Sequence, residues 1–216
     1  MNIAKMIIRE VFNKNSINEK YYRYIQSNSR ASIKMLTKAL LETAKTIPPK
    51  KPYQFNHPTI KILDVGSGTA GKLMQFRGAI DTLKTLNLIR DDINIETHGL
   101  EVDPNLACIA DYSHLEHQKL TIIEDALKFK KYKDYDIIYY YCPIKDTKLQ
   151  IRLEKLIERS IKKGAHIIAI NKQNCPYSYN KKHQKLPKNI IDQTEKYNIY
   201  ENYRIGGYND LILQKI

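Results

Sequence analysis

The spacing of apolar residues divides the chain into a helical first part and a longer part with a different rhythm. Between Ile33 and Ile47 apolar residues recur at helical intervals, and Pro48-Pro49 ends this pattern. From residue 59 onward, short apolar runs alternate with segments of helical periodicity. We therefore predict a helical N-terminal extension with its linker over residues 1–58 and an α/β domain over residues 59–216.

The second part has the pattern of consecutive β/α units followed by a hairpin. Gly206-Gly207 lies between two final strand candidates and is a hairpin signal. We expect a seven-stranded, mostly parallel sheet that ends in an antiparallel hairpin. The strand candidates are residues 60–65, 94–102, 120–123, 136–141, 166–170, 199–205 and 210–216. The helix candidates are a segment around Leu73–Leu83, residues 105–115, a segment from Leu149 to Ile161 capped by Gly164, and residues 187–198.

The positive charge is concentrated near the start of the chain. The whole chain carries 36 basic and 23 acidic residues, a net charge of +13. Residues 1–58 hold 11 Lys/Arg and 3 Glu, which gives +8, so the other 158 residues contribute +5. Such an excess favours an acidic or nucleic-acid partner for the N-terminal segment. A bias toward Lys, Asn, Ile and Tyr along the whole chain raises the isoelectric point as well, so both interpretations stay open.

Composition and cysteine spacing exclude several other classes of protein. The chain has no apolar run near the ~20 residues of a membrane span and no signal-peptide pattern. Cys108, Cys142 and Cys175 lie far apart without a C-x-x-C pair, so neither a disulfide framework nor a zinc site is expected. We expect a cytoplasmic protein without a metal and without a membrane partner.

A glycine-rich turn follows the first strand candidate of the second part. Glycines at such a turn allow a ligand to approach the backbone, and the next helix N-terminus offers N–H groups to an anion. Gly66, Gly68 and Gly71 satisfy G-x-G-x-x-G, so a nicotinamide dinucleotide has to be considered. The acidic residue of that fingerprint is expected ~20 residues later, whereas Glu101 follows Gly71 by 30. Asp64, a charged residue at the end of an apolar strand, also disfavours the dinucleotide and needs a partner for its carboxylate.

The order of motifs resembles that of the seven-stranded, class I S-adenosylmethionine-dependent methyltransferases, which have a Rossmann-like fold. The resemblance covers about residues 59–216. Its motifs are Ile62–Ala70 for the glycine loop, Gly99–Asp103 for the acidic end of the second strand, Glu124–Ala126 for the adenine-reading motif, Asp136–Ile144 for the fourth strand and its loop, and Tyr203–Ile216 for the reversed last strand.

The resemblance implies S-adenosylmethionine as the cofactor and assigns parts of it to particular residues. The glycine loop and helix N-terminus are expected to hold the methionine carboxylate, and Glu101 to accept from both ribose hydroxyls. The sulfonium favours oxygens and aromatic faces, which Tyr140 or Tyr141 would supply. The expected cofactor-binding residues are Asp64, Gly66, Ser67, Gly68, Thr69, Glu101, Val102, Asp125, Ala126 and Tyr141.

The loop after the fourth strand is expected to face the methyl group, and it narrows the acceptor only slightly. Family members that methylate amines of nucleic acids carry an Asn/Asp/Ser-Pro-Pro-aromatic loop, whereas this chain has Tyr141-Cys142-Pro143-Ile144. Cytosine-C5 enzymes have a Pro-Cys order, so we interpret Cys142 as a packing residue. Asn174–Tyr177 mimics the amine-methylating loop but follows the fifth strand. A protein side chain or a small molecule is therefore slightly favoured over nucleic acid.

The catalytic residues are not specified by the sequence. On a strand, Tyr139 and Tyr141 face one side and Tyr140 the other, so at least one should be in the core, and Tyr141 is the weak catalytic candidate. As general bases, His98, Tyr141 and His183 are conceivable.

Three functions are therefore compared. The first is a methyltransferase whose N-terminal extension covers the active site or helps to recognise the substrate. The second is a non-catalytic or weakly active module that binds RNA or a protein partner through its basic N-terminal helices. The third, a nicotinamide oxidoreductase, is supported by the three glycines alone.

Overall fold

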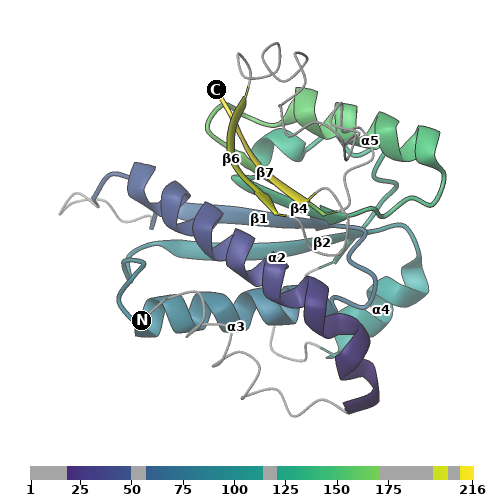
Figure 1. Cartoon of the computed structure of the whole chain (residues 1–216), viewed down its shortest axis with the longest axis horizontal. Helices are drawn as coiled ribbons and strands as arrows, with labels where there is room; N and C mark the ends of the chain where they lie inside the picture. The colour runs from purple at the N-terminus through teal and green to yellow at the C-terminus, as the bar shows by residue number, and fades with distance from the viewer. Residues whose placement is uncertain (1–18, 50–56, 114–120, 171–196, 204–209) are drawn as a thin grey trace, which may run out of the picture.

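The computed structural model describes residues 19–49, 57–113, 121–170, 197–203 and 210–216, and these form a sheet with helices on both faces (Figure 1). The elements are α2 (Glu19–Thr46), β1 (Thr59–Val65), α3 (Gly71–Thr85), β2 (Asn94–Glu101), α4 (Pro104–Ser113), β3 (Thr121–Ile123), the 3-10 helix η1 (Tyr132–Asp134), β4 (Ile137–Tyr141), α5 (Thr147–Ser160), β5 (His166–Ile170), β6 (Tyr197–Tyr203) and β7 (Asp210–Lys215).

The seven strands lie in the order β3-β2-β1-β4-β5-β7-β6. Strands β3, β2, β1, β4 and β5 are parallel to one another, whereas β7 is antiparallel to both β5 and β6. The predicted fold class, a mostly parallel Rossmann-like sheet with an antiparallel C-terminal pair, is confirmed. Asp64 in β1 lies between Gly99 of β2 and Tyr139 of β4 in the register. The sheet therefore brings three of the sequence motifs side by side.

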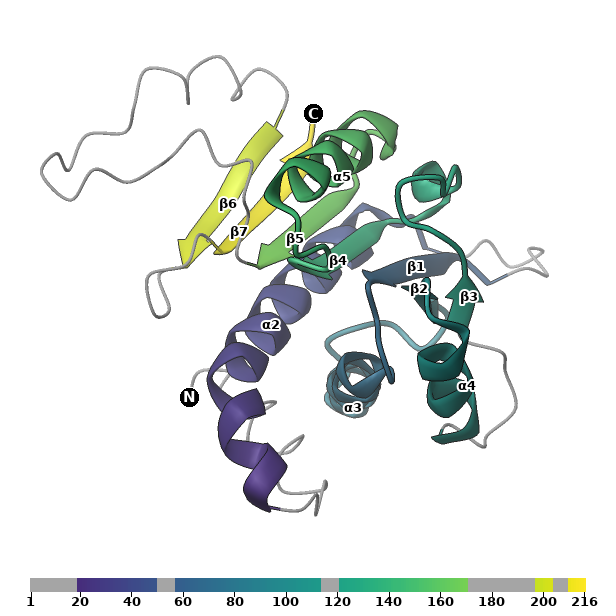
Figure 2. The same ribbon diagram turned by 90° about the vertical axis from the view of Figure 1, so that its right-hand side faces the viewer.

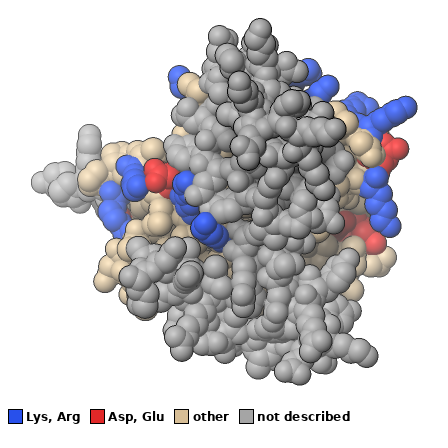
Figure 3. Space-filling model, viewed as in Figure 1, with Lys and Arg blue, Asp and Glu red and all other residues tan. Residues whose placement is uncertain are grey.

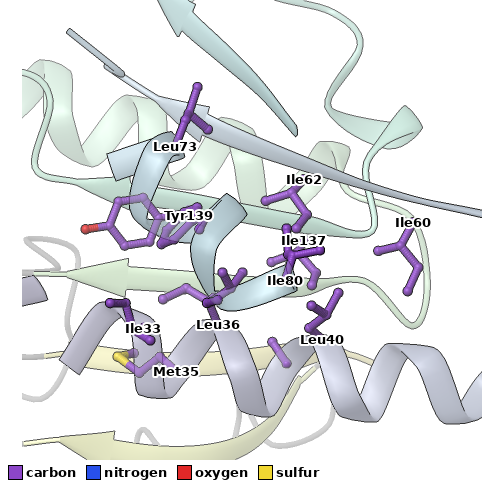
Figure 4. Packing of buried hydrophobic residues seen from close by; sticks show 14 of the residues in the cluster. Ile33, Met35, Leu36, Leu40, Ile60, Ile62, Leu73, Ile80, Ile137 and Tyr139 are labelled. Carbon is purple, nitrogen blue, oxygen red and sulfur yellow. The ribbon is translucent and has the colours of Figure 1, made fainter. Parts of the chain in front are cut away.

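Two apolar cores, one on each face, hold the helices to the sheet. Helices α2, α3 and α4 cover one face and α5 covers the other (Figure 2), where Tyr132 of η1 is also part of the core. In the first core, Leu36 and Leu40 of α2 meet Ile62 of β1 and Ile80 of α3 (Figure 4). Burial of each such side chain contributes about 1.5–3 kcal/mol to folding. This packing fixes the strands whose ends carry the candidate site.

Helix α2 is part of this apolar core, and polar contacts join it to the sheet as well. The hydroxyl groups of Ser32 and Tyr139 lie 3.0 Å apart, and the Thr43 hydroxyl lies 3.1 Å from Nδ1 of His166. Arg90 donates to the carbonyls of Ile47 and Pro48, which directly follow the helix. The helix ends before Pro48-Pro49, as the sequence predicts. The division of the chain at residue 58 stays a prediction.

Some expected elements differ from those observed. Leu149, expected on the buried face of its helix, is exposed, whereas Gln150 and Glu154 are fully buried there. Gly164, expected as the helix cap, lies in the turn before β5 with φ +81°, and the C-cap of α5 is Ile161. The helix expected over residues 187–198 lies mostly outside the described residues, and its last two positions begin β6. Within the described ranges, none of the helices has the length and apolar character needed to cross a bilayer.

Candidate functional site

The candidate residues gather at the carboxyl edge of the sheet, where the strand order reverses. From β1 the chain continues to β2 and β3 on one side and then crosses to β4 on the other. Ligands of open α/β sheets bind in the crevice at such a switch point. Asp64, Glu101, Ile123 and Tyr141 are the last or second-last residues of β1 to β4. The sheet therefore places side chains from four separate motifs along one edge.

The glycine loop is hydrogen-bonded to the end of β2. The N–H groups of Gly66 and Ser67 both donate to the carbonyl of Leu100, at 2.8 and 3.2 Å. The Ser67 side chain turns back against Gly99, where a Cβ would collide with its Oγ. This buried Oγ has no hydrogen-bond partner in the described part of the chain. Gly99 thus makes room for Ser67, whose side chain points into the sheet layer.

Only part of the G-x-G-x-x-G pattern has the geometry of a dinucleotide fingerprint. Gly66 has φ +74°, and a Cβ at this position would collide with the Cβ of Pro143 in the loop after β4. Gly71 has no such constraint, because a Cβ there would meet nothing within 4 Å. In the dinucleotide fingerprint the third glycine permits close helix–strand packing. Gly71 does not have that role, which disfavours the nicotinamide interpretation.

The carboxylate of Glu101 joins the end of β2 to the glycine loop. Its Oε2 accepts from the N–H of Gly68 at 2.8 Å, and its Oε1 accepts from the N–H groups of Val102 and Asp103 at 2.9 and 3.0 Å. Glu101 is buried. A carboxylate has about four acceptor positions, so these three bonds leave about one for a ligand, on Oε2.

Asp64 has a charged partner that the sequence did not identify. Burial raises its pKa to about 7, while Lys72 lowers it and Glu101 raises it. Lys72 is the second residue of α3, and burial lowers its pKa to about 8 against the opposing effect of Asp64. The Lys72 ammonium also donates to Gln75 at 3.2 Å. The edge therefore holds a buried acid, Asp64, beside a half-buried base of opposite charge, Lys72, with pKa values of about 7 and about 8.

The first turn of α3 faces the same loop. Its N-cap, Ala70, has a left-handed backbone with φ 59°, and no side chain of the described residues caps it. The first N–H groups of a helix have no partner inside the helix and carry a partial positive charge. Lys72 adds a full charge to that end. This combination suits the carboxylate of a ligand.

The ends of β2 and β3 expose apolar surface. Val102 is 65% exposed and Ile123 is 50% exposed, and Ile123 pairs in register with Glu101. Beyond β3, Oδ1 of Asp125 accepts from the N–H of Leu127 at 2.9 Å. This part of the edge therefore has two exposed apolar side chains beside the carboxylate of Asp125, whose Oδ1 already accepts one hydrogen bond.

The Ala126 carbonyl beyond β3 also has a partner. It accepts from the hydroxyl of Tyr132 at 2.7 Å. Burial, together with the negative charge of Asp125, raises the pKa of that hydroxyl above its usual value, so it remains a donor. Ala126 is therefore fixed through its backbone rather than presented by a flexible loop.

The tyrosines of β4 are arranged as the alternation predicts. Tyr139 and Tyr140 are buried on opposite faces, and Tyr141 is 46% exposed at the edge. Tyr139 packs edge-on against Phe76 with ring centroids 5.1 Å apart. Cys142, which follows, is half-buried and has φ +38°, an unusual backbone conformation for a residue with a side chain.

The candidate bases are less well placed. His98 lies three residues before the end of β2, about 10 Å from the edge. Its ring packs against Tyr135, with centroids 5.8 Å apart. His183 and Asn174–Tyr177 lie outside the described residues. Of the three candidates, Tyr141 is the one that the structure places at the edge.

On the face seen in Figure 3, the charged side chains of the described residues are not gathered into one basic patch. In the view of Figure 3, Lys and Arg side chains lie in separate groups at opposite sides, each with Asp or Glu nearby. Within α2, the Lys45 ammonium forms an ion pair with the Glu42 carboxylate at 2.8 Å. The lopsided charge of residues 1–58 remains a feature of the sequence.

Neither protein-family models nor curated proteins match the sequence. Solved structures do match. A protein from Staphylococcus aureus assigned as a caffeoyl-CoA O-methyltransferase has a TM-score of 0.53 at 15% identity, over 98% of both chains. The chain has the Rossmann-like methyltransferase fold. The CurJ carbon methyltransferase gives a TM-score of 0.52 at 12% identity, over 90% of this chain and 57% of its own. At these identities the likeness concerns the fold.

Proposed function

We propose that this protein is an S-adenosylmethionine-dependent methyltransferase. The observation that carries the proposal is the hydrogen bond from Gly68 to Glu101, which holds an acidic side chain of β2 beside the glycine loop of β1. S-adenosylmethionine has an amino-acid end and a ribose diol but no phosphate. A site for it needs a carboxylate for the diol close to groups that bind a zwitterion, and this edge has both.

The amino-acid end fits Asp64, Lys72 and the start of α3. Its carboxylate would lie at the uncapped helix N-terminus near Lys72, and its ammonium near Asp64. The two protein charges are opposite to the two ligand charges, so a bound zwitterion compensates the cost of burying them. Lys72 thus joins the cofactor-binding residues expected from the sequence.

The nucleoside end fits the ends of β2 and β3. Oε2 of Glu101 keeps about one acceptor position for a ribose hydroxyl, so a second hydroxyl would replace one of its backbone donors. The exposed side chains of Val102 and Ile123 supply apolar contact for the adenine ring. Asp125 and Ala126 follow directly and would read its amino group.

The chemistry requires positioning more than it requires a base. A lone pair of the acceptor atom would form a bond to the methyl carbon of bound S-adenosylmethionine while the methyl–sulfur bond breaks, with the electron pair of that bond staying on the sulfur of the product S-adenosylhomocysteine. Any proton on the acceptor passes to solvent or to a nearby base. Alignment of the two reactants supplies most of the rate in such a reaction. Tyr141 is exposed beside Cys142, and we assign it to the wall on the methyl side.

The acceptor is proposed to be a small molecule or a protein side chain. Compared with the loop of amine-methylating nucleic-acid enzymes, the loop after β4 has Tyr141 in place of the polar residue, Cys142 in place of the first proline and Ile144 in place of the closing aromatic. The alternative, a non-catalytic module that binds RNA or a protein through the basic N-terminal segment, predicts a different salt response. RNA affinity should fall steeply with salt because counterions are released, whereas cofactor affinity should change little.

Calorimetric titration of the full chain with S-adenosylmethionine, S-adenosylhomocysteine and NAD tests the proposal. We expect micromolar binding of both sulfur compounds and none of NAD. Asp64→Asn and Lys72→Met should each weaken binding by about tenfold, since each removes one charge from the pair. Gly71→Ala serves as the control and should bind normally. If neither S-adenosylmethionine nor S-adenosylhomocysteine binds, the proposed cofactor is refuted.

A further inference from the structure

Helix α5 buries two polar side chains where its apolar face should continue. Gln150 and Glu154 are fully buried, one turn apart, in the same stripe as Leu153 and Ile157. Buried polar pairs contribute less to stability than well-packed apolar side chains of similar size. Leucine or methionine would therefore serve the packing of α5 as well or better. The two polar residues call for another explanation.

Gln150 uses both ends of its amide. Its Oε1 accepts from the backbone N–H of Ile144 at 3.1 Å, and its Nε2 donates to Oε1 of Glu154 at 3.0 Å. The oxygen can only accept and the NH₂ group can only donate, so the two bonds together fix the orientation of the amide. Glu154 thereby fixes Gln150, and Gln150 fixes a backbone atom of the loop after β4.

That loop touches the glycine loop one residue earlier. Pro143 lies so close to Gly66 that no side chain fits between them. Cys142, between Pro143 and the exposed Tyr141, has a strained positive φ. A strained backbone persists where its surroundings hold it on both sides. Here β4 holds one side, and the hydrogen bond from Ile144 to Gln150 holds the other.

We propose that Gln150 is a positioning residue for the site. Through the N–H of Ile144 it holds Pro143 against Gly66. It thereby fixes the position of Tyr141 and Cys142 relative to the glycine loop. The inference rests on the proposed function, because it assigns Gln150 to the geometry of methyl transfer. Gln150 is fully buried, so it would act through the backbone of the loop rather than by contact with a ligand.

The double variant Gln150→Met/Glu154→Leu separates positioning from packing. Its apolar side chains fill similar volumes, so its thermal midpoint should equal or exceed that of the wild type. The N–H of Ile144 loses its acceptor, so hydrogen exchange at this amide should be at least about tenfold faster. The affinity for S-adenosylhomocysteine should fall by about tenfold, because the glycine loop loses its support.

Two single variants are the controls. Glu154→Gln keeps an acceptor for Gln150, so exchange at Ile144 and the affinity should stay within about twofold of the wild type. Leu153→Ala lies on the same stripe without a described bond to the loop, so it should lower the thermal midpoint but leave the affinity of the folded protein within about twofold. If the double variant does not fold, Gln150→Met alone replaces it.

The results have separate meanings. Wild-type affinity in the folded double variant, or unchanged exchange at Ile144, would overturn the role of Gln150. An equal loss of affinity in Leu153→Ala would overturn it too, because general loosening would then explain the effect. A wild-type protein that does not bind S-adenosylhomocysteine would instead refute the proposed function, and the inference with it.

Discussion

The backbone N–H of Gly68 donates to the carboxylate of Glu101 at 2.8 Å, so the acid at the end of β2 is part of the loop that follows β1. Two further N–H groups, those of Val102 and Asp103, share the same carboxylate. The side chain proposed to bind ribose is therefore also a structural group. Removal of the carboxylate should therefore disturb the loop even when no ligand is bound.

Glu101→Ala should lower stability as well as cofactor binding. It leaves three backbone donors without their acceptor, at a cost of about 3 kcal/mol in the free energy of unfolding. Glu101→Gln keeps one oxygen and should cost about 1 kcal/mol, while still weakening S-adenosylmethionine binding. Urea denaturation and calorimetry on the same samples measure both effects. If Glu101→Ala is as stable as the wild type, the structural role is wrong.

Alanine substitutions at Gly66 and Gly71 should have opposite effects. Gly66→Ala places a Cβ against Pro143 in a backbone with φ +74°, so it should destabilise the protein by about 2 kcal/mol and abolish cofactor binding. Gly71→Ala adds a Cβ in open space at the first position of α3 and should be neutral or slightly stabilising. Thermal unfolding of the pair checks this. Equal damage from both would restore the dinucleotide interpretation.

Cofactor affinity should depend on pH through Asp64. Its pKa of about 7 means that it is largely protonated at pH 6 and ionised at pH 8. The ammonium of S-adenosylmethionine prefers the ionised form, so affinity should rise with pH to a maximum between 7 and 8, above which Lys72, with its pKa of about 8, loses its charge. Below pH 7 the limiting slope should be about tenfold per pH unit. Titrations between pH 5.5 and 7.5 measure this slope, and in Asp64→Asn it should be lost. A pH-independent wild-type affinity would remove Asp64 from the site.

Acid should destabilise the protein through His166, which bonds to Thr43 of α2. Burial lowers its pKa from 6.5 to about 4, against the charges of Glu42 and Asp136. Between these values the unfolded chain takes up a proton that the folded chain does not, so stability falls as pH drops from 6.5 to 4. The loss should total about 3 kcal/mol and be complete below 4.

Denaturation at several pH values checks this loss against two variants. His166→Gln should show a correspondingly shallower dependence on pH. His57→Gln, which replaces an exposed histidine, should retain the wild-type slope. If His166→Gln has the same slope as the wild type, the acid sensitivity has another source.

The strands and the glycine loop could be predicted because their signals are local. Apolar runs bounded by turn residues gave all seven strands to within a few residues, and the run ending in Asp64 placed the loop. Asp64 could also be predicted to need a partner, since a buried carboxylate is costly. The identity of that partner could not, because Lys72 is one of many lysines and only the fold places it on the same face.

The burial of Gln150 and Glu154 in α5 could not be predicted from the sequence for a similar reason. Periodicity favours Leu149 over Gln150 for the buried face, because apolar residues are expected inside. The structure buries Gln150 instead, because Ile144 and Glu154 satisfy its amide. A tertiary contact between a loop and a helix decides this position, and no spacing along the chain reports such a contact.

Because the strand order reverses at β1, two separate stretches of chain build the carboxyl edge of the sheet. One side is built from residues 59–113 and 121–126 and the other from residues 137–170. Substitutions in the second stretch can therefore alter what faces the glycine loop while the bonds of Glu101 stay as they are. Gly66 and Pro143 are the seam between the two stretches. During divergence we expect these two positions to change together or not at all.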